Sequence, residues 1–294
     1  GLGYKLKYES KALPDFVSFL ESQGSTCITV KLALCWATLP KNVQPAWWAR
    51  RLSYIRNFAR YMSSIDPRTE IPALDLLPYR YQRPTPHIYT HDEIIRLLDA
   101  AKNIQPTTGL RRWTYYYFFG LLAATGLRLS EGINLQCKDV DLDKNMLTIH
   151  KTKFKKSRLV PIHASTSDHL KEYILRRDAF LKKRAENSFF VSELGKPLKI
   201  STVIWTFRKL SVQIGLRNPS DSTGPRTHGF RHTFTTNTLL NCYRDCLDVE
   251  QCMPRLSTFL GHTNVTNTYW YLSSVPELLA LTVILLEKRQ EELS

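Results

Sequence analysis

The stretch DVDLDKNMLTIHKTKFKKSRLVPIH, residues 139–163, carries the clearest β pattern of the 294-residue chain. Three runs that alternate or stay apolar lie at 139–142, 146–154 and 158–163. The turn-forming triplets DKN and KKS separate them, and short runs joined by such turns are typical of hairpins. This stretch therefore predicts a small, three-stranded antiparallel sheet.

The sequence on both sides of the predicted sheet has the pattern of helices. Upstream, WTYYYFFGLLAATG (113–126) is strongly apolar, and Gly126 is placed to end the helix. Further upstream, Thr90 and Glu93 have the spacing of a capping box before an apolar run. After Pro161 the chain is again mostly helical in pattern. These patterns predict a mainly α fold with a small antiparallel β-sheet, an α+β class.

The first part of the chain predicts a separate helical domain. Residues 8–64 have helical periodicity, including AWWARRLSYIRNFARYMSSI (46–65), where four arginines are dispersed among apolar positions. Such arginines form either a solvated face or a face that contacts phosphates. Residues 66–89 are proline-rich and lack a helical period, which is typical of an extended linker. We therefore predict two domains, at 1–84 and 85–294.

The charge of the chain predicts a polyanionic partner. Lys and Arg (41) exceed Asp and Glu (26), which gives a net charge of +15. The excess is 12 against 6 in residues 1–89 and 29 against 20 in the remainder, so both parts are basic. Nucleic acid is the commonest partner of such a chain, although a soluble protein can be basic without one.

Membrane and metal-binding features are not predicted. No run of 18 apolar residues appears, and the start, GLGYKLKYES, has no apolar stretch, so we expect neither a membrane span nor a signal peptide. The cysteines at 242, 246 and 252 match no zinc-ligand spacing and are interpreted as ordinary thiols. The sequence therefore predicts no metal and no cofactor.

Two short motifs in the second predicted domain pair an arginine with an ionisable residue. In TGLRLSE, Arg128 and Glu131 are three residues apart and share a helix face. In THGFRHTF, His228 and Arg231 have the same spacing at a predicted helix start, which suits an anion. Taken alone, the first is also explained as a surface ion pair and the second as a structural histidine beside an arginine.

Two further motifs add lysines and tyrosines. The predicted hairpin carries alternating lysines, Lys151, Lys153 and Lys155. They fit either the protection of an edge strand or a reach towards a phosphate. In LGHTNVTNTYWYLS (260–273), His262 is followed by two tyrosines, Tyr269 and Tyr271. Aromatic packing beside a structural histidine explains this motif when it is considered alone.

Together the four motifs have the composition of a metal-free phosphoryl-transfer site. Two arginines and a histidine supply fixed donors for the non-bridging oxygens of a pentacoordinate phosphate. A tyrosine supplies a nucleophile, but its ordinary pKa of about 10 requires a base or an electropositive pocket. A lysine can protonate the leaving sugar oxygen.

The order of these motifs resembles the tyrosine recombinases, or phage-type integrases, over residues 90–275. The resemblance implies a set of catalytic residues and one supporting acid: Arg128, Lys153, His228, Arg231, His262 and Tyr271, with Glu131 in support. Alignment on RLVP selects Lys153, with Lys151 as second choice. Spacing from His262 selects Tyr271, with Tyr269 as its rival. The stretch between the last two boxes is longer than is usual in the family, which predicts a lengthened loop or helix around 241–256.

The resemblance also implies an activity. The chain would be a site-specific DNA recombinase (integrase) that forms a 3′-phosphotyrosyl link through Tyr271, without metal, ATP or another cofactor. Residues 1–84 would be a helical core-binding DNA-binding domain, and residues 85–294 a catalytic domain with a C-terminal helix.

The implied partner is a double-stranded recombination site. A tetramer would hold two duplexes and exchange C-terminal helices, in the bacterial cytoplasm at the nucleoid. Two alternatives remain. An enzyme like the type IB topoisomerases would relax supercoils without a recombinant product, and a non-catalytic DNA-binding protein on the same fold would be indifferent to Tyr271→Phe.

Overall fold

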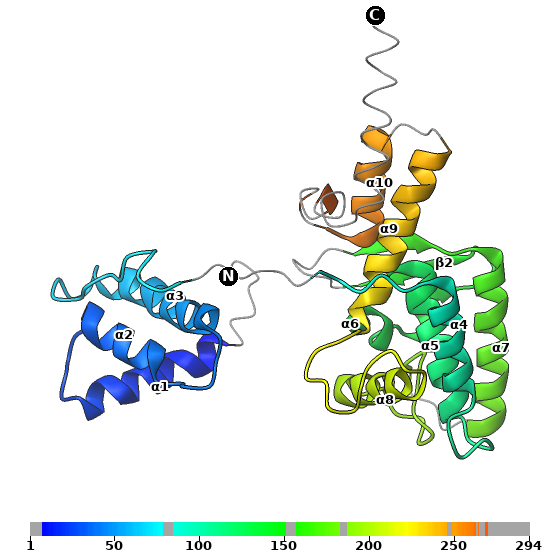
Figure 1. Cartoon of the computed structure of the whole chain (residues 1–294), viewed down its shortest axis with the longest axis horizontal. Helices are drawn as coiled ribbons and strands as arrows, with labels where there is room; N and C mark the ends of the chain where they lie inside the picture. The colour runs from blue at the N-terminus through cyan, green and yellow to red at the C-terminus, as the bar shows by residue number, and fades with distance from the viewer. Residues whose placement is uncertain are drawn as a thin grey trace, which may run out of the picture. The chain divides into compact units, whose positions relative to one another are not determined.

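The computed structural model describes residues 8–78, 85–150, 157–182, 187–245, 249–262, 264 and 268–269. The chain divides into two compact units, Gly1–Pro84 and Thr85–Ser294, which we call the N-terminal unit and the C-terminal unit (Figure 1). Lys153, Tyr271 and the expected C-terminal helix lie outside the described residues. Among the helices that the structure describes, none is long and apolar enough to cross a membrane.

The N-terminal unit forms helices around a core of its own. These are α1 (Glu9–Ser22), α2 (Val30–Thr38) and α3 (Pro45–Met62). The Thr29 hydroxyl caps the start of α2, and α3 starts at Pro45, where the missing N–H is not needed. The largest buried side chains of the core come from all three helices: Phe16, Trp36, Leu52 and Ile55. The helical character predicted for residues 8–64 is confirmed.

The four arginines of α3 divide between buried and exposed positions. Arg56 is buried and donates to carbonyl oxygens of the segment after α3 at 2.8 and 2.7 Å. Arg51 lies over the Trp36 ring at 3.7 Å, whereas Arg50 and Arg60 are exposed. The interpretation of all four as one solvated or phosphate-contacting face is therefore wrong for Arg51 and Arg56. The extended segment leaves carbonyls that need donors, and Arg56 supplies them.

The C-terminal unit begins with two helices whose ends match the predicted signals. Helix α4 (His91–Lys102) starts with the reciprocal capping box of Thr90 and Glu93. Helix α5 (Arg111–Thr125) ends at Gly126, which is left-handed with a φ of 60°. Figure 1 shows α5 packed beside α4 and α7 (Ala164–Leu181).

The predicted sheet is confirmed, with first and third strands shorter than expected; residues 151–154 of the second predicted strand lie outside the described residues. Strands β1 (Val140–Asp141), β2 (Met146–Ile149) and β3 (Arg158–Pro161) pair antiparallel in the order β1-β2-β3. Leu147 of β2 pairs with Val160 of β3, and both are fully buried against the helices. This register puts Arg158, the first residue of β3, opposite Ile149 at the end of β2.

The remaining helices complete a mainly α unit, so the predicted fold class is confirmed. They are α6 (Leu129–Ile133), α8 (Ile200–Gln213), α9 (His228–Arg244) and α10 (Val249–Leu260). The core of this unit contains a group of buried phenylalanines: Phe118, Phe119, Phe190, Phe207 and Phe230. The described part of the lengthened stretch around 241–256 is largely helical, since it forms the end of α9 and the start of α10.

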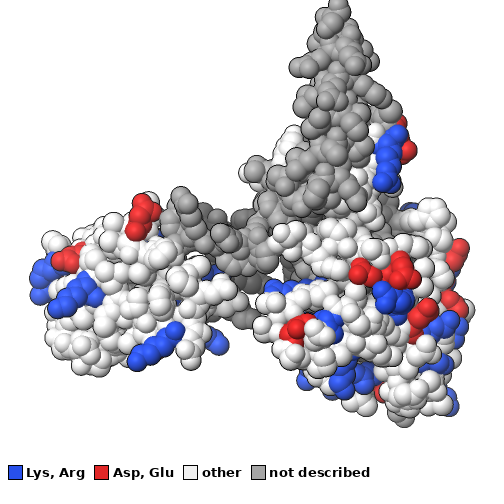
Figure 2. All heavy atoms as spheres, viewed as in Figure 1, with Lys and Arg blue, Asp and Glu red and all other residues white. Residues whose placement is uncertain are grey.

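The basic charge is dispersed over the face drawn in Figure 2. Lys and Arg side chains alternate with Asp and Glu over the C-terminal unit in this view. On this face no continuous basic patch covers the described residues of that unit.

Candidate active site

The turn at Gly126 determines where the first predicted arginine is held. The positive φ of Gly126 ends α5, and a Cβ on this residue would lie 2.7 Å from the Phe234 ring of α9. Glycine is favoured on both counts, because it tolerates left-handed backbone and allows close approach. Two residues later, Arg128 forms the N-cap of α6, and Glu131 lies in the first turn of that helix.

Arg128 and Glu131 form a partly buried ion pair. Nη1 of Arg128 donates to Oε1 of Glu131 at 2.9 Å, and the Arg128 backbone N–H donates to Oε2 at 3.0 Å. The Glu131 side chain is 7% exposed and the Arg128 side chain 30%. The predicted pairing is confirmed, and the alternative of a solvated surface pair is wrong. The carboxylate faces inward while part of the guanidinium stays open.

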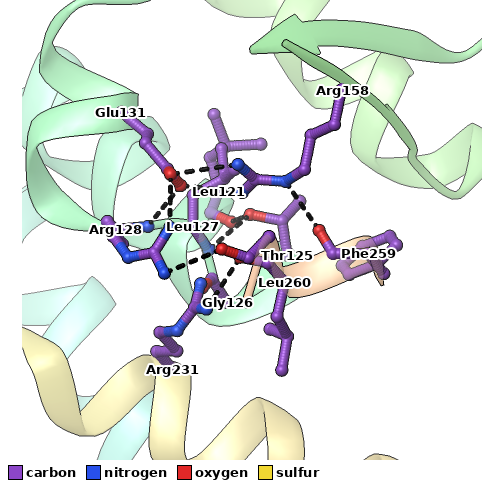
Figure 3. Close-up of polar contacts among 11 residues, drawn as sticks. Leu121, Thr125, Gly126, Leu127, Arg128, Glu131, Arg158, Arg231, Phe259 and Leu260 are labelled. Atoms are coloured by element: carbon purple, nitrogen blue, oxygen red, sulfur yellow. Dashed lines mark hydrogen bonds and ion pairs between the residues drawn. The ribbon is translucent and has the colours of Figure 1, made fainter. Parts of the chain in front are cut away.

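Arg158 is a second arginine on the same carboxylate, and it was not among the predicted site residues. Its Nη1 and Nη2 donate to Oε1 and Oε2 of Glu131 at 3.0 and 2.8 Å (Figure 3). Burial alone would raise the pKa of Glu131, but Arg158 and then Arg128 outweigh it and hold that pKa below its ordinary value. One feature of the sequence could have indicated this role: Arg158 is a charged residue at the start of RLVP, a strand that is otherwise apolar.

Arg231 is the most deeply buried arginine of the site, with 2% of its surface exposed. It extends from the first turn of α9, where Nη1 donates to the Gly126 carbonyl at 2.9 Å and Nη2 to the Leu260 carbonyl at 2.8 Å. The side chain therefore joins the end of α5 to the end of α10. Figure 3 shows its guanidinium pointing towards the same region as that of Arg128.

The start of α9 is held against the segment that precedes α4. A Cβ on Gly229 would lie 2.5 Å from the Tyr89 ring, and the Tyr89 backbone N–H donates to Thr233 Oγ1 at 2.7 Å. The glycine of HGFR thus allows this close contact. His228, the first residue of α9, is exposed, and its ring meets the His232 ring edge-on at 4.7 Å.

His262 follows the left-handed Gly261 directly after α10. Its Nδ1 lies 2.8 Å from the Thr268 hydroxyl, a contact that the sequence analysis did not predict. Burial above all, and then the positive charges of Arg231 and Arg128, lower the pKa of His262 to about 4. His262 is therefore neutral at pH 7, with one ring nitrogen protonated and the other an acceptor.

The fold brings Arg128, Glu131, Arg231 and His262 together from elements that are far apart in the chain. His228 is also close enough for its charge to help lower the pKa of His262. Lys153 and Tyr271 lie outside the described residues and stay predictions. The rival Tyr269 is described and is 50% exposed. In the parts of the chain that the structure describes, no three His, Cys, Asp or Glu side chains are grouped to hold a metal ion.

Comparison with known proteins gives the same family over most of the chain. The family model described as the phage integrase family matches residues 88–277. A Sinorhizobium fredii protein named as an integrase/recombinase, y4rB, is 48% identical over 99% of this chain and 94% of its own length. Tyrosine recombinase XerD of Staphylococcus saprophyticus is 31% identical over 76% of this chain and 70% of its own.

Solved structures have the same fold. The crystal structure of the XerH site-specific recombinase superposes with a TM-score of 0.66 at 18% identity, over 88% of this chain and 73% of that one. The Tn1549 transposon integrase also gives 0.66, at 17% identity, over 90% of this chain and 88% of that one. The matched region, residues 88–277, contains every predicted site residue, and on these grounds the chain belongs to the phage integrase family.

Proposed function

We propose that this chain recombines double-stranded DNA at specific sites by cutting and rejoining strands through a 3′-phosphotyrosyl intermediate. As a member of the phage integrase family it is a site-specific tyrosine recombinase. The observation that carries the residue assignment is the convergence of Arg128, Arg231 and the neutral His262 from three separate elements. Such a group of fixed donors suits the oxygens of one phosphate.

The partly open guanidinium of Arg128 is the proposed primary ligand of the scissile phosphate. A guanidinium presents planar, paired N–H donors that match phosphate oxygens, and that of Arg128 is already oriented by Glu131. The buried Arg231 of α9 adds a second positive charge to the site. When Nδ1 of His262 accepts a hydrogen bond from Thr268, its Nε2 carries the proton and donates to a phosphate oxygen.

Tyr271 is the proposed nucleophile, and its assignment rests on the spacing from His262. Its phenolic oxygen forms a bond to phosphorus while the bond from phosphorus to the 5′ oxygen breaks. Lys153 gives a proton to the departing 5′ oxygen, and His228 accepts or orients the tyrosine proton. A 5′-hydroxyl of a second strand then attacks the phosphotyrosine and restores the tyrosine. The number of phosphodiester-type bonds is conserved, so no ATP is consumed, and the cationic side chains supply the charge stabilisation that a metal ion gives in other phosphoryl transfers.

The N-terminal unit is the proposed second DNA-binding element, and its support is its basic charge. A tetramer on two duplexes with exchanged C-terminal helices is part of the same proposal. In support, a structural neighbour is a lambda integrase tetramer bound to a Holliday junction. The related proteins named above are bacterial, and the proposed place of action is the bacterial cytoplasm at the nucleoid.

Covalent trapping tests the proposal. Duplexes that bind the protein are selected from a randomised pool, and a nick is then placed beside each candidate cleavage position so that religation is lost. We expect a protein–DNA adduct that resists denaturation and maps by peptide mass to Tyr271. Tyr271→Phe should abolish the adduct, and Tyr269→Phe is the matched control that should retain it.

Three outcomes would overturn parts of the proposal. An adduct on Tyr269 would transfer the role of nucleophile to the neighbouring tyrosine. Relaxation of supercoiled DNA by the wild-type protein without any recombinant product would favour a topoisomerase. Unchanged DNA processing by Tyr271→Phe would contradict the assigned site as a whole.

A further inference from the structure

We infer that Arg158 is a positioning residue for cleavage, and that it acts by holding Arg128, through Glu131, against the C-terminal turn of α10. The inference deepens the proposed function and rests on it. Arg158 itself is not assigned to the phosphate, because its side chain is 10% exposed and all three guanidinium nitrogens donate to protein acceptors.

Three arginines from three elements bind three successive carbonyls at the end of α10. Nε of Arg158 donates to the Phe259 carbonyl at 2.7 Å, and Nη2 of Arg231 donates to the Leu260 carbonyl at 2.8 Å. Nη2 of Arg128 donates to the Gly261 carbonyl at 3.1 Å. The last carbonyls of a helix lack intrahelical donors and carry the negative end of its dipole. The three carbonyls of this turn therefore hold the three guanidinium groups at fixed positions relative to one another.

The charge balance gives Arg158 a further role at Arg128. An isolated Arg128–Glu131 pair has no net charge, and such a pair attracts a phosphate weakly. With Arg158 bound to the same carboxylate through both η nitrogens, the three side chains carry a net charge of +1. Arg158 therefore lets Glu131 orient Arg128 without cancelling its positive charge.

Arg158 also links the start of β3 to the turn that precedes His262. It opens β3, and Lys153 precedes it by five positions in the sequence. Its bond to the Phe259 carbonyl fixes the turn that leads into His262. A Cβ on Gly261 would lie 2.7 Å from Nη1 of Arg158, so glycine is what allows the guanidinium to pack directly on this turn.

A double-mutant comparison separates this role from a contribution to folding. In single-turnover trapping on the nicked duplex, we expect Arg158→Gln to slow cleavage by the pre-bound complex on the order of 100-fold, the cost of a misplaced catalytic group. Arg158→Lys, which reaches one carboxylate oxygen, should fall between wild type and Arg158→Gln. The affinity for the intact duplex should change little. In an Arg128→Ala background, Arg158→Gln should slow cleavage by less than about threefold, because the group that it positions is absent.

Arg177 supplies the matched control. It is another buried arginine of the C-terminal unit, with an ion pair to Asp178 at 2.7 Å and a bond to the Phe189 carbonyl at 3.1 Å. Arg177→Gln should lower the melting temperature without slowing cleavage by the folded protein. Millimolar guanidinium should partly restore cleavage to Arg158→Ala but not to Arg128→Ala combined with Arg158→Gln.

A second readout does not depend on activity. The charge of Arg158 contributes to the low pKa of His262, so Arg158→Gln should raise the NMR-measured pKa of His262 and Arg177→Gln should not. The inference would be overturned if Arg158→Gln slowed cleavage equally with and without Arg128. It would also be overturned if Arg177→Gln slowed cleavage as much as Arg158→Gln does. Absence of any adduct with the wild-type protein would refute the proposed function instead, and with it the role of Arg158 in cleavage. If Arg158→Gln leaves the pKa of His262 unchanged, that result alone contradicts the proposed closeness of the two charges.

Discussion

His262 is a neutral side chain among positive charges, and this state has a consequence for stability. Its pKa is about 4 in the folded chain, whereas an unfolded chain restores the ordinary value of 6.5. Between these values the unfolded state binds more protons, so protonation favours unfolding. The contribution of His262 to stability is complete above the unfolded pKa and is lost as the pH falls from 6.5 through 4.

A comparison at two pH values tests this titration. We expect the DNA-free wild-type protein to lose more thermal stability between pH 7 and pH 5 than His262→Gln does, because glutamine does not titrate. Melting temperatures by calorimetry give the measurement. His91→Gln is the control, since His91 is an exposed histidine at the start of α4. If wild type and His262→Gln lose equal stability, His262 is not held neutral.

At the scale of elements, the end of α5 and the start of α9 depend on one glycine. Gly126 is left-handed, it lies against Phe234 of α9, and its carbonyl accepts the bond from Arg231. A side chain at this position therefore strains the backbone and also displaces the helix that carries the second arginine. Both effects follow from contacts between α5 and α9 rather than from either helix alone.

Two glycine-to-alanine variants separate these effects. Gly215 is also left-handed, with a φ of 75°, but a Cβ there meets nothing within 4 Å. We expect Gly215→Ala to cost about 1–2 kcal/mol from backbone strain. Gly126→Ala should cost about 2–4 kcal/mol, since overpacking against Phe234 adds to the strain. Urea denaturation measures the difference, and trapping should show slower cleavage for Gly126→Ala alone. If the two variants lose equal free energy of unfolding, the Phe234 side chain moves aside without a cost.

At the scale of the whole molecule, both units are basic, and a duplex contacted by both should bind with a strong salt dependence. Each phosphate contact that is lost lowers the slope of log K against log salt by about 1. Arg60 of α3 is exposed, so its side chain is available for such a contact. Arg68 is exposed in the same unit, but its guanidinium is paired with Asp66 at 2.8 Å.

These two arginines form a test of the proposed role of the N-terminal unit. Arg60→Gln should weaken duplex binding at every salt concentration and reduce the salt slope by about 1. The double variant Asp66→Asn with Arg68→Gln should leave both nearly unchanged, because it removes the ion pair without changing the net charge. Fluorescence anisotropy over a series of salt concentrations gives both quantities. Identical behaviour of the two variants would argue against phosphate contacts by α3 at Arg60.

Local sequence determined the elements of this protein. The Thr90–Glu93 capping box, the stop at Gly126 and the paired strands at 140–161 were all predictable, because each depends on backbone preferences within a few residues. The Arg128–Glu131 pair was predictable for the same reason, since three residues separate its members.

Tertiary structure alone decided what the arginines do. Arg158 reaches Glu131 across 27 positions, Arg231 reaches Leu260 across 29, and Arg128 reaches Gly261 across 133. Such partners are chosen by which carbonyls and carboxylates the packed core leaves buried and in need of donors. Local pattern carries no record of that need, which is why the sequence identified Arg128 and Arg231 but neither Arg158 nor the helix end that aligns all three.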